Sequence, residues 1–262
     1  MPGFSCEAVM KIVTFNIRYD TPHDGINAFS HRAGAILQKI ESERPDILCF
    51  QECRPHVFDF MKRHLMDYEL MGCGRGERYD DEHNPVAIRK DGFELIGLET
   101  EWLSPTPDVP GSRYEEQSDC PRIVTRATVL PLGSGRPFYV FNTHLDHMSE
   151  GARVLGARQV ISLMRERLAR REMPLILTGD FNAYPGSLPV NAFLADEVLK
   201  LTDHTDGLPN SYHNYGRSAE PRIDYIMSRG FRALSPLGVW NDARDGIYLS
   251  DHYPLSIELE ME

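Results

Sequence analysis

The chain has 262 residues, of which 41% are hydrophobic and 26% charged, a composition typical of a folded globular protein and not of a disordered or fibrous one. Its length suits one large α/β domain or two small ones, and because the sequence offers no linker we expect a single domain over 1–262. The formal net charge of -11, with no basic cluster to offset it, argues against strong sequence-independent binding to duplex nucleic acid.

The five cysteines form no CxxC pair and are too sparse for a disulfide framework, so they suit a reducing cytoplasm. No basic stretch followed by an apolar core marks a signal peptide, and no run approaches the roughly 20 apolar residues that cross a bilayer. We therefore expect a cytoplasmic protein without a membrane anchor. Membrane lipids are poor substrate candidates, because the net charge opposes binding to an anionic surface.

Strand and helix patterns alternate in the first part of the chain. Residues 11–17 are β-branched and aromatic and predict a strand that ends in turn-forming residues. Apolar residues at helical spacing then predict a helix with Ser30 as its N-cap, closed by Pro45. A second buried strand over 46–52 precedes a helix that begins at Pro55.

The pattern changes after the second helix. Short strand-like runs separated by Gly, Pro and Asp predict an antiparallel sheet over 68–140. A long helix with Ser149 at its start then leads to the apolar run 175–177, and later strands are predicted over 222–228 and 254–260. Alternating βα units followed by a meander favour a layered α/β domain with at least one mixed sheet.

Polar side chains follow several of the apolar runs, where ligands gather in open α/β sheets. Asp180 and Asn182 stand two apart after 175–177, so on an extended segment they point to the same side. Asp224 lies inside a strand-like run, where an acidic side chain is costly to bury unless it is paired, and His252 would serve as its partner. The other polar strand ends are Asn16, Glu52, His144 and Asp251.

Each of these features alone also has an ordinary structural explanation. The run 179–182 can be a turn, because Gly, Asp and Asn favour turns, and Glu52 can lie near the N-terminus of the helix begun by Pro55. His144 can be a hydrogen-bonded core histidine, and Asp251 can cap the entry to a strand. A shared site explains all of them together.

Six motifs, in this order and across nearly the whole chain, resemble the endonuclease/exonuclease/phosphatase superfamily, whose fold is that of pancreatic deoxyribonuclease: FNIRYD, FQE, NTHLDH, GDFN, RIDYIMS and SDHYPL. The resemblance implies an α/β fold built as a four-layer α/β/β/α sandwich, with two mixed β-sheets face to face and helices on the outer faces. It also implies a divalent metal at one end of the sandwich.

The resemblance implies a role for each polar strand end. Glu52 would be the principal metal ligand, with Asn16 beside it and Asp251 completing the shell. Carboxylate oxygens suit Mg²⁺ or Mn²⁺, and the set is too carboxylate-rich for a thiolate zinc site. Asp180 would position or deprotonate the attacking water, and Asn182 would contact the phosphate.

The remaining polar residues would act on protons and on the phosphate. His252 with Asp224 matches the family's His/Asp pair, in which the carboxylate fixes the tautomer of the imidazole. His144 would donate a hydrogen bond to the phosphate in the transition state. The sequence leaves open whether His252 or Asp180 is the general base.

The reaction expected is metal-dependent hydrolysis of a phosphodiester by in-line attack of water, with a small molecule or a nucleotide as the favoured substrate. One alternative is a nuclease acting on single-stranded RNA or DNA, in which Trp102, Tyr114 and Tyr184 can stack bases, although core packing explains them equally well. A second alternative is a non-catalytic module that binds a phosphate ligand. The sequence gives no prediction for the oligomeric state.

Three further polar residues lie in the stretches EHNPVAIRKDGFEL, EWLSPTPDVPGSR and CPRIVTRATV. These stretches look like an uncharacterised bacterial-type subgroup reminiscent of the deadenylase and nocturnin branch. Asn84, Arg113 and Arg122 can hold a phosphate or a sugar there. For each arginine, a solvated or salt-bridged surface position is at least as good an explanation.

Overall fold

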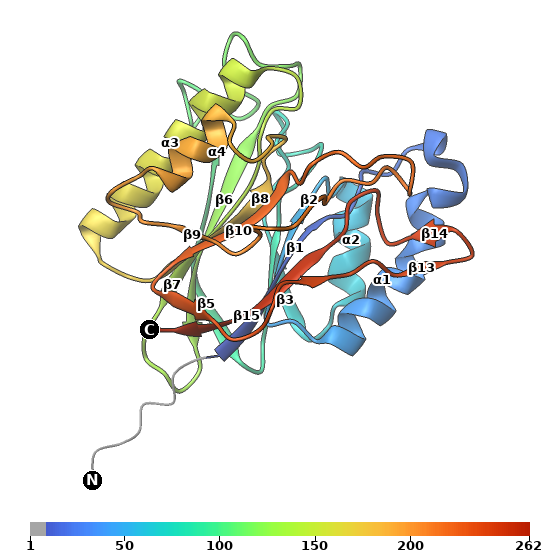
Figure 1. Cartoon of the computed structure of the whole chain (residues 1–262), viewed down its shortest axis with the longest axis horizontal. Coiled ribbons are helices and arrows are strands. Elements are labelled where there is room, and N and C mark those ends of the chain that lie inside the picture. Colours follow the sequence, from blue (N-terminus) through green and yellow to red (C-terminus); the bar gives the residue numbers. More distant parts are fainter. Residues whose placement is uncertain (1–8) are drawn as a thin grey trace.

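The computed structural model describes residues 9–262, so Cys6 lies outside the described residues. Within this range two large β-sheets face each other, and helices cover both outer faces (Figure 1). The expected four-layer sandwich of two mixed sheets is therefore confirmed. No helix among the described residues is both long and apolar enough to cross a membrane.

The first sheet contains the N-terminal strand. Its strand order is β11 (Phe231–Ala233), β15 (Leu255–Met261), β1 (Val9–Asn16), β2 (Ile47–Gln51), β4 (Val86–Arg89) and β3 (Tyr68–Met71), and β12 (Gly238–Val239) also pairs with β15. β1 and β2 are parallel, and the other pairs are antiparallel. Helices α1 (Phe29–Glu43) and α2 (Pro55–His64) pack on its outer face.

The second sheet also combines one parallel strand pair with antiparallel pairs. Its strand order is β5 (Phe93–Trp102), β6 (Ile123–Pro131), β7 (Phe138–His144), β8 (Leu175–Asp180), β10 (Asp224–Arg229) and β9 (Thr202–Asp203). β7 and β8 are parallel, because the long helix α3 (Glu150–Arg170) carries the chain back between them. α3 and α4 (Leu188–Leu194) cover this sheet's outer face. The smaller elements are η1 (Pro22–Asn27) and the pair β13 (Ala243–Arg244) and β14 (Ile247–Tyr248).

Apolar side chains fill the space between the sheets, including Ile12 and Ile47 from one and Val140 and Ile176 from the other. Where β2 and β7 end, buried polar side chains lie between the sheets instead. Gln51 Nε2 donates to Asn142 Oδ1 at 2.7 Å, and Asn142 Nδ2 donates to the Phe50 carbonyl at 2.8 Å. These hydrogen bonds tie the ends of β2 and β7 together.

Two expectations about elements are wrong. The helix expected to be capped by Ser30 begins at Phe29 with Ala28 at its N-cap, so Ser30 lies in its first turn. The antiparallel sheet expected over 68–140 is divided, because β3 and β4 pair with β2 whereas β5, β6 and β7 form the second sheet. An alternating apolar pattern marks a strand but does not say which sheet buries it.

Candidate active site

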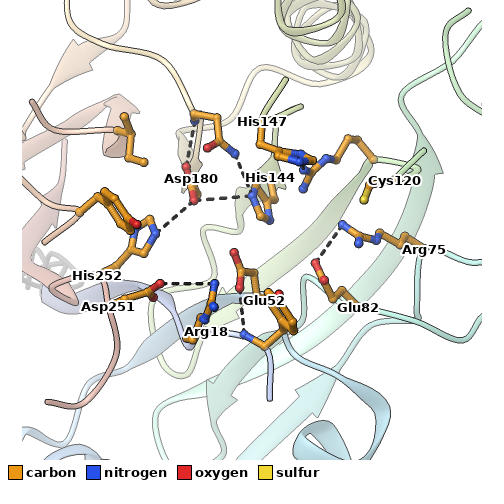
Figure 2. A pocket seen from close by; sticks show the side chains of 15 residues that line it. Arg18, Glu52, Arg75, Glu82, Cys120, His144, His147, Asp180, Asp251 and His252 are labelled. Atoms are coloured by element: carbon orange, nitrogen blue, oxygen red, sulfur yellow. Dashed lines mark hydrogen bonds and ion pairs between the residues drawn. The ribbon is translucent and has the colours of Figure 1, made fainter. Parts of the chain in front are cut away.

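The predicted site residues come together at one end of the sandwich. The parallel pairs β1–β2 and β7–β8 end there, and their antiparallel neighbours β15 and β10 begin there. Polar residues that follow one strand and precede another therefore meet, as Figure 2 shows for most of them. These residues are Asn16, Glu52, His144, Asp180, Asn182, Asp224, Asp251 and His252.

Glu52 is held by hydrogen bonds on both carboxylate oxygens. Oε1 accepts from Asn16 Nδ2 at 3.0 Å, and Oε2 accepts from the Tyr19 backbone N–H at 2.8 Å. Burial opposes the charge, but these hydrogen bonds and the nearby His252 lower the pKa of Glu52 below its usual value. Glu52 is therefore a fixed carboxylate that faces the pocket.

Asp180 occupies the centre of the site. Its Oδ2 accepts from Asn16 Nδ2 at 2.9 Å, and its Oδ1 accepts from the Asn182 backbone N–H at 2.8 Å. The strand register places His144 beside it on β7 and Asp224 beside it on β10. Burial, followed by the charge of Asp224, raises the pKa of Asp180 to about 7. Its carboxylate can therefore exchange a proton near neutral pH.

His252 and Asp224 form the expected pair. His252 Nδ1 lies 2.8 Å from Asp224 Oδ2, and His252 Nε2 lies 3.8 Å from Asp180 Oδ2. Burial opposes protonation, but the charge and hydrogen bond of Asp224 raise the pKa of His252 to about 10. The imidazole is therefore a cation at neutral pH, with Nε2 facing Asp180.

His144 stays neutral beside Asn182. Burial, followed by the charge of Arg122, holds the pKa of His144 well below its usual value. Asn182 Nδ2 lies 3.0 Å from His144 Nε2 and donates to the Leu145 carbonyl at 3.1 Å. With the amide in this orientation Nε2 accepts a hydrogen bond, so donation from Nε2 to a phosphate requires the other tautomer.

Asp251 forms an ion pair with Arg18, a pocket residue that the sequence analysis did not name. Arg18 Nη1 is 3.5 Å from Asp251 Oδ2, while the same guanidinium donates twice to Asp24 at 3.0 Å. Burial, together with the charge of Glu52, raises the pKa of Asp251. Arg18 lies inside the motif FNIRYD, so the sequence contained a signal for it.

The wall of the pocket across from His252 contains two arginines, Arg75 and Arg122. Arg122 is 4% exposed, its Nη2 lies 3.0 Å from His147 Nδ1, and its Nε and Nη1 have no hydrogen-bond partner among the described residues. Arg75 is paired, since Nη1 lies 2.9 Å from Glu82 Oε2. In Figure 2 Arg75 and Glu82 lie on the right, across Glu52 from His252 and Asp251.

Three residues of this wall were also missed. His147 belongs to the motif NTHLDH and was therefore recognisable. Arg75 and Glu82 come from the loop between β3 and β4. Backbone hydrogen bonds hold this loop at the pocket; for example, the Cys53 N–H donates to the His83 carbonyl at 3.2 Å. Glu82 stands two residues before Asn84 in a stretch that the subgroup resemblance covers, whereas no strand or motif in the sequence marks Arg75.

Asn84 and Arg113 do not line this pocket. Asn84 is buried and its Nδ2 donates to the Ile123 carbonyl at 3.2 Å. Arg113 pairs with Asp119 at 3.2 Å and donates to two backbone carbonyls. The structure therefore brings Arg122 to the other site residues and leaves Asn84 and Arg113 apart from them.

The three aromatic residues considered for base stacking differ in position. Trp102 is buried, and its indole N–H donates to the Arg75 carbonyl at 2.6 Å. Tyr114 donates to Gln159 at 2.8 Å. Tyr184 is 46% exposed, and its ring is accessible.

The side chains in the pocket fit a divalent cation. Ligand atoms of Asp180, Asp224 and His252 lie within 4.8 Å of one another, but His252 is a cation paired with Asp224 and cannot bind a metal. The better group is Glu52, His144 and Asp180, whose ligand atoms are equally close. Oxygen-rich donor sets of this kind suit Mg²⁺ or Mn²⁺. Asn16 is oriented differently from a ligand, since its amide nitrogen faces the carboxylates while its oxygen accepts from the Arg18 backbone N–H at 3.0 Å.

Comparisons with known proteins identify the family. Residues 13–252 match the Endonuclease/Exonuclease/phosphatase family. An endonuclease/exonuclease/phosphatase from Bacteroides vulgatus is 30% identical with a TM-score of 0.91, over 98% of this chain and 100% of that chain. A mannosyl-6-phosphatase from Bacteroides thetaiotaomicron VPI-5482 is 30% identical with a TM-score of 0.86, over 95% of this chain and 99% of that chain.

The similarity extends to the branch that the sequence indicated. Nocturnin from Drosophila melanogaster is 26% identical over 187 residues, which are 66% of this chain and 27% of that protein. Members of the matched family are hydrolases that act on phosphoester bonds. This chain belongs to the endonuclease/exonuclease/phosphatase family.

Proposed function

We propose that the protein hydrolyses a small phosphate ester with Mg²⁺ or Mn²⁺ as its cofactor. The observation that carries the proposal is the contact of Asp180 with Asn16, Asn182 and the His252–Asp224 pair at a pocket that also contains Glu52. Within it, Glu52 holds the metal with Asp251 nearby and Asn16 orienting the carboxylates. The bound cation would supply Lewis-acid stabilisation of charge on the phosphoryl group.

Asp180 is the general base in this proposal. A carboxylate with a pKa of about 7 can take a proton from water at neutral pH, whereas an imidazole with a pKa of about 10 already holds one. His252 acts instead as a cation and a hydrogen-bond donor through Nε2, held by Asp224. Asn182 fixes Asp180 through its backbone N–H and presents its side chain to the phosphate.

Arg122 supplies positive charge for the phosphate. Its guanidinium has no directly hydrogen-bonded carboxylate, since Asp146 Oδ2 lies 3.9 Å from Nε. A buried cation without a hydrogen-bonded carboxylate is costly, and an anionic substrate would offset that cost. We assign Arg122 and His144 to the phosphate, whereas Asn84 and Arg113 have their own partners and support no substrate role.

A sugar phosphate monoester is the favoured substrate. The cavity of about 430 Å³ suits a small molecule, and the similar mannosyl-6-phosphatase is named for a phosphomonoester. The phosphodiester that the sequence favoured is the second candidate, since a further cavity continues beyond the pocket. A nuclease is less favoured, because the net charge is -11. A cytoplasmic location stays a prediction.

The test is phosphate or alcohol release from a panel of esters with Mg²⁺, Mn²⁺ or EDTA. The panel contains a hexose 6-phosphate, p-nitrophenyl phosphate, bis(p-nitrophenyl) phosphate and a short single-stranded oligonucleotide. We expect metal-dependent hydrolysis that is lost in Asp180→Ala and retained in Asp119→Ala, a carboxylate that is 99% exposed outside the pocket. Hydrolysis of none of these esters, or equal activity in EDTA, would contradict the proposal.

A further inference from the structure

A second cavity adjoins the candidate active site. Its volume is about 420 Å³, and it shares four lining residues with the first cavity: His147, Asn182, Tyr212 and Ile223. Asn182 therefore faces both spaces, with its side-chain amide near His144 and its backbone N–H on Asp180. A phosphate bound beside Asp180 and Asn182 has room on this side for the group it is attached to.

The walls of this second cavity differ from those of the first. Tyr184 is 46% exposed, and its hydroxyl donates to Glu220 Oε2 at 2.9 Å, which fixes the ring. Glu150 is a second carboxylate, and Arg153 is held by donating to the Asp146 carbonyl at 3.0 Å. Two carboxylates beside one guanidinium disfavour a second anion in this space.

These groups suit a neutral, hydroxylated molecule. Carboxylate oxygens accept hydrogen bonds from hydroxyl groups, and a guanidinium donates to them. An exposed tyrosine ring offers an apolar face to the C–H side of a sugar. The first cavity also contains carboxylates, which suit the proposed metal, and its Arg122 has no hydrogen-bonded carboxylate and can therefore offer its charge to the phosphate.

We propose that the second cavity binds the hydroxylated organic part of the substrate, a sugar or another polyol, and that Tyr184 and Glu220 determine this specificity. The inference rests on the proposed function, because the substrate's phosphate is placed beside Asp180. It adds where the organic group of the substrate binds and which residues recognise it.

The test compares a hexose 6-phosphate with ethyl phosphate, whose ethyl group carries no hydroxyl. We expect Tyr184→Ala to lower kcat/KM for the hexose 6-phosphate by about tenfold while the value for ethyl phosphate is unchanged. Tyr184→Phe keeps the ring and should lose less. Tyr79→Ala is the matched control, since Tyr79 is 56% exposed and lines neither cavity.

Binding to an inactive variant separates the two proposals. Calorimetric titration of hexose 6-phosphate into Asp180→Asn, with and without Tyr184→Ala, should show about tenfold weaker binding in the double variant. If the wild-type protein hydrolyses no ester but this difference appears, the proposed reaction fails and the sugar subsite stands. Equal losses for both substrates, or no loss in either measurement, would overturn the subsite.

Discussion

Asp180 and His252 both have pKa values well above those of the isolated side chains. Burial, followed by the charge of Asp224, raises the pKa of Asp180 to about 7, whereas the charge and hydrogen bond of Asp224 raise the pKa of His252 to about 10 against the effect of burial. One carboxylate therefore influences both the base and the cation of the proposed reaction. These pKa values favour Asp180 over His252 as the general base of the proposed reaction, a choice that the sequence left open.

The pH dependence of kcat tests this assignment. Activity should rise as Asp180 loses its proton, with an apparent pKa at or below about 7 because a bound cation favours the carboxylate, and should fall as His252 loses its proton near 10. Asp224→Asn removes the charge that raises both values. Both limbs of the profile should then move to lower pH. If activity in Asp224→Asn rises and falls at the same pH values as in the wild type, the assignment is contradicted.

Arg122 is expected to contribute to activity at a cost in stability. Arg122→Met should lower kcat/KM by roughly 100-fold, because an anion-stabilising group is lost from the pocket. Its Tm should stay the same or rise, since a buried charge without a hydrogen-bonded carboxylate is removed. Arg126→Met is the matched control: Arg126 is also buried but pairs with Glu99 and Glu101, so its loss should lower Tm and spare activity.

The strands bring the candidate catalytic side chains together, and β7 lies so close to β8 at Gly179 that a side chain there would clash with it. At Gly179, which precedes Asp180, φ is +150°, and an added Cβ would lie 1.9 Å from the Thr143 carbonyl oxygen of β7. Gly179→Ala should therefore push β8 from β7 and destabilise the fold by about 3 kcal/mol, with loss of activity. Urea unfolding measures the first effect.

Gly133 provides the control for that substitution. It also has positive φ, at +85°, but no atom lies within 4 Å of its added Cβ. Gly133→Ala should cost about 1 kcal/mol from backbone strain alone and leave activity intact. Equal destabilisation by the two substitutions would show that strain, and not the approach of β7, restricts position 179.

The strands also explain which parts of the site were predictable. Asp180, His144 and Glu52 end apolar runs, so their types and positions are visible in the sequence, and parallel pairing brings such ends together. Arg75 and Glu82 reach the pocket from a loop whose path depends on contacts distant in sequence. Local patterns do not encode that path, so Arg75 could not be predicted, whereas Glu82 stands two residues before Asn84 in a stretch that the subgroup resemblance covers.

For the molecule as a whole, the six ordered motifs predicted the sandwich, whereas periodicity alone gave alternating strands and helices. The division of 68–140 between two sheets depends on which face each strand buries, and the short runs do not specify it. Similarly, the net charge of -11 argued against a basic surface but did not show that Arg122 lies in the pocket without a hydrogen-bonded carboxylate.

Metal binding should be linked to the stability of the whole fold, because the carboxylates of Glu52, Asp180 and Asp251 meet only when both sheets are formed. A cation that binds the native state at 100 times its Kd adds about 2.7 kcal/mol. For a protein of this size that should raise Tm by about 5 to 10 °C in Mg²⁺ or Mn²⁺ relative to EDTA.

Differential scanning calorimetry of two variants would assign this effect to the proposed site. Glu52→Gln should abolish the metal-dependent rise in Tm, because it removes the principal ligand. Glu82→Gln should retain most of the rise, since Glu82 lines the same pocket but pairs with Arg75 at 2.9 Å. A rise that survives in Glu52→Gln would place the cation elsewhere and remove Glu52 from the metal site.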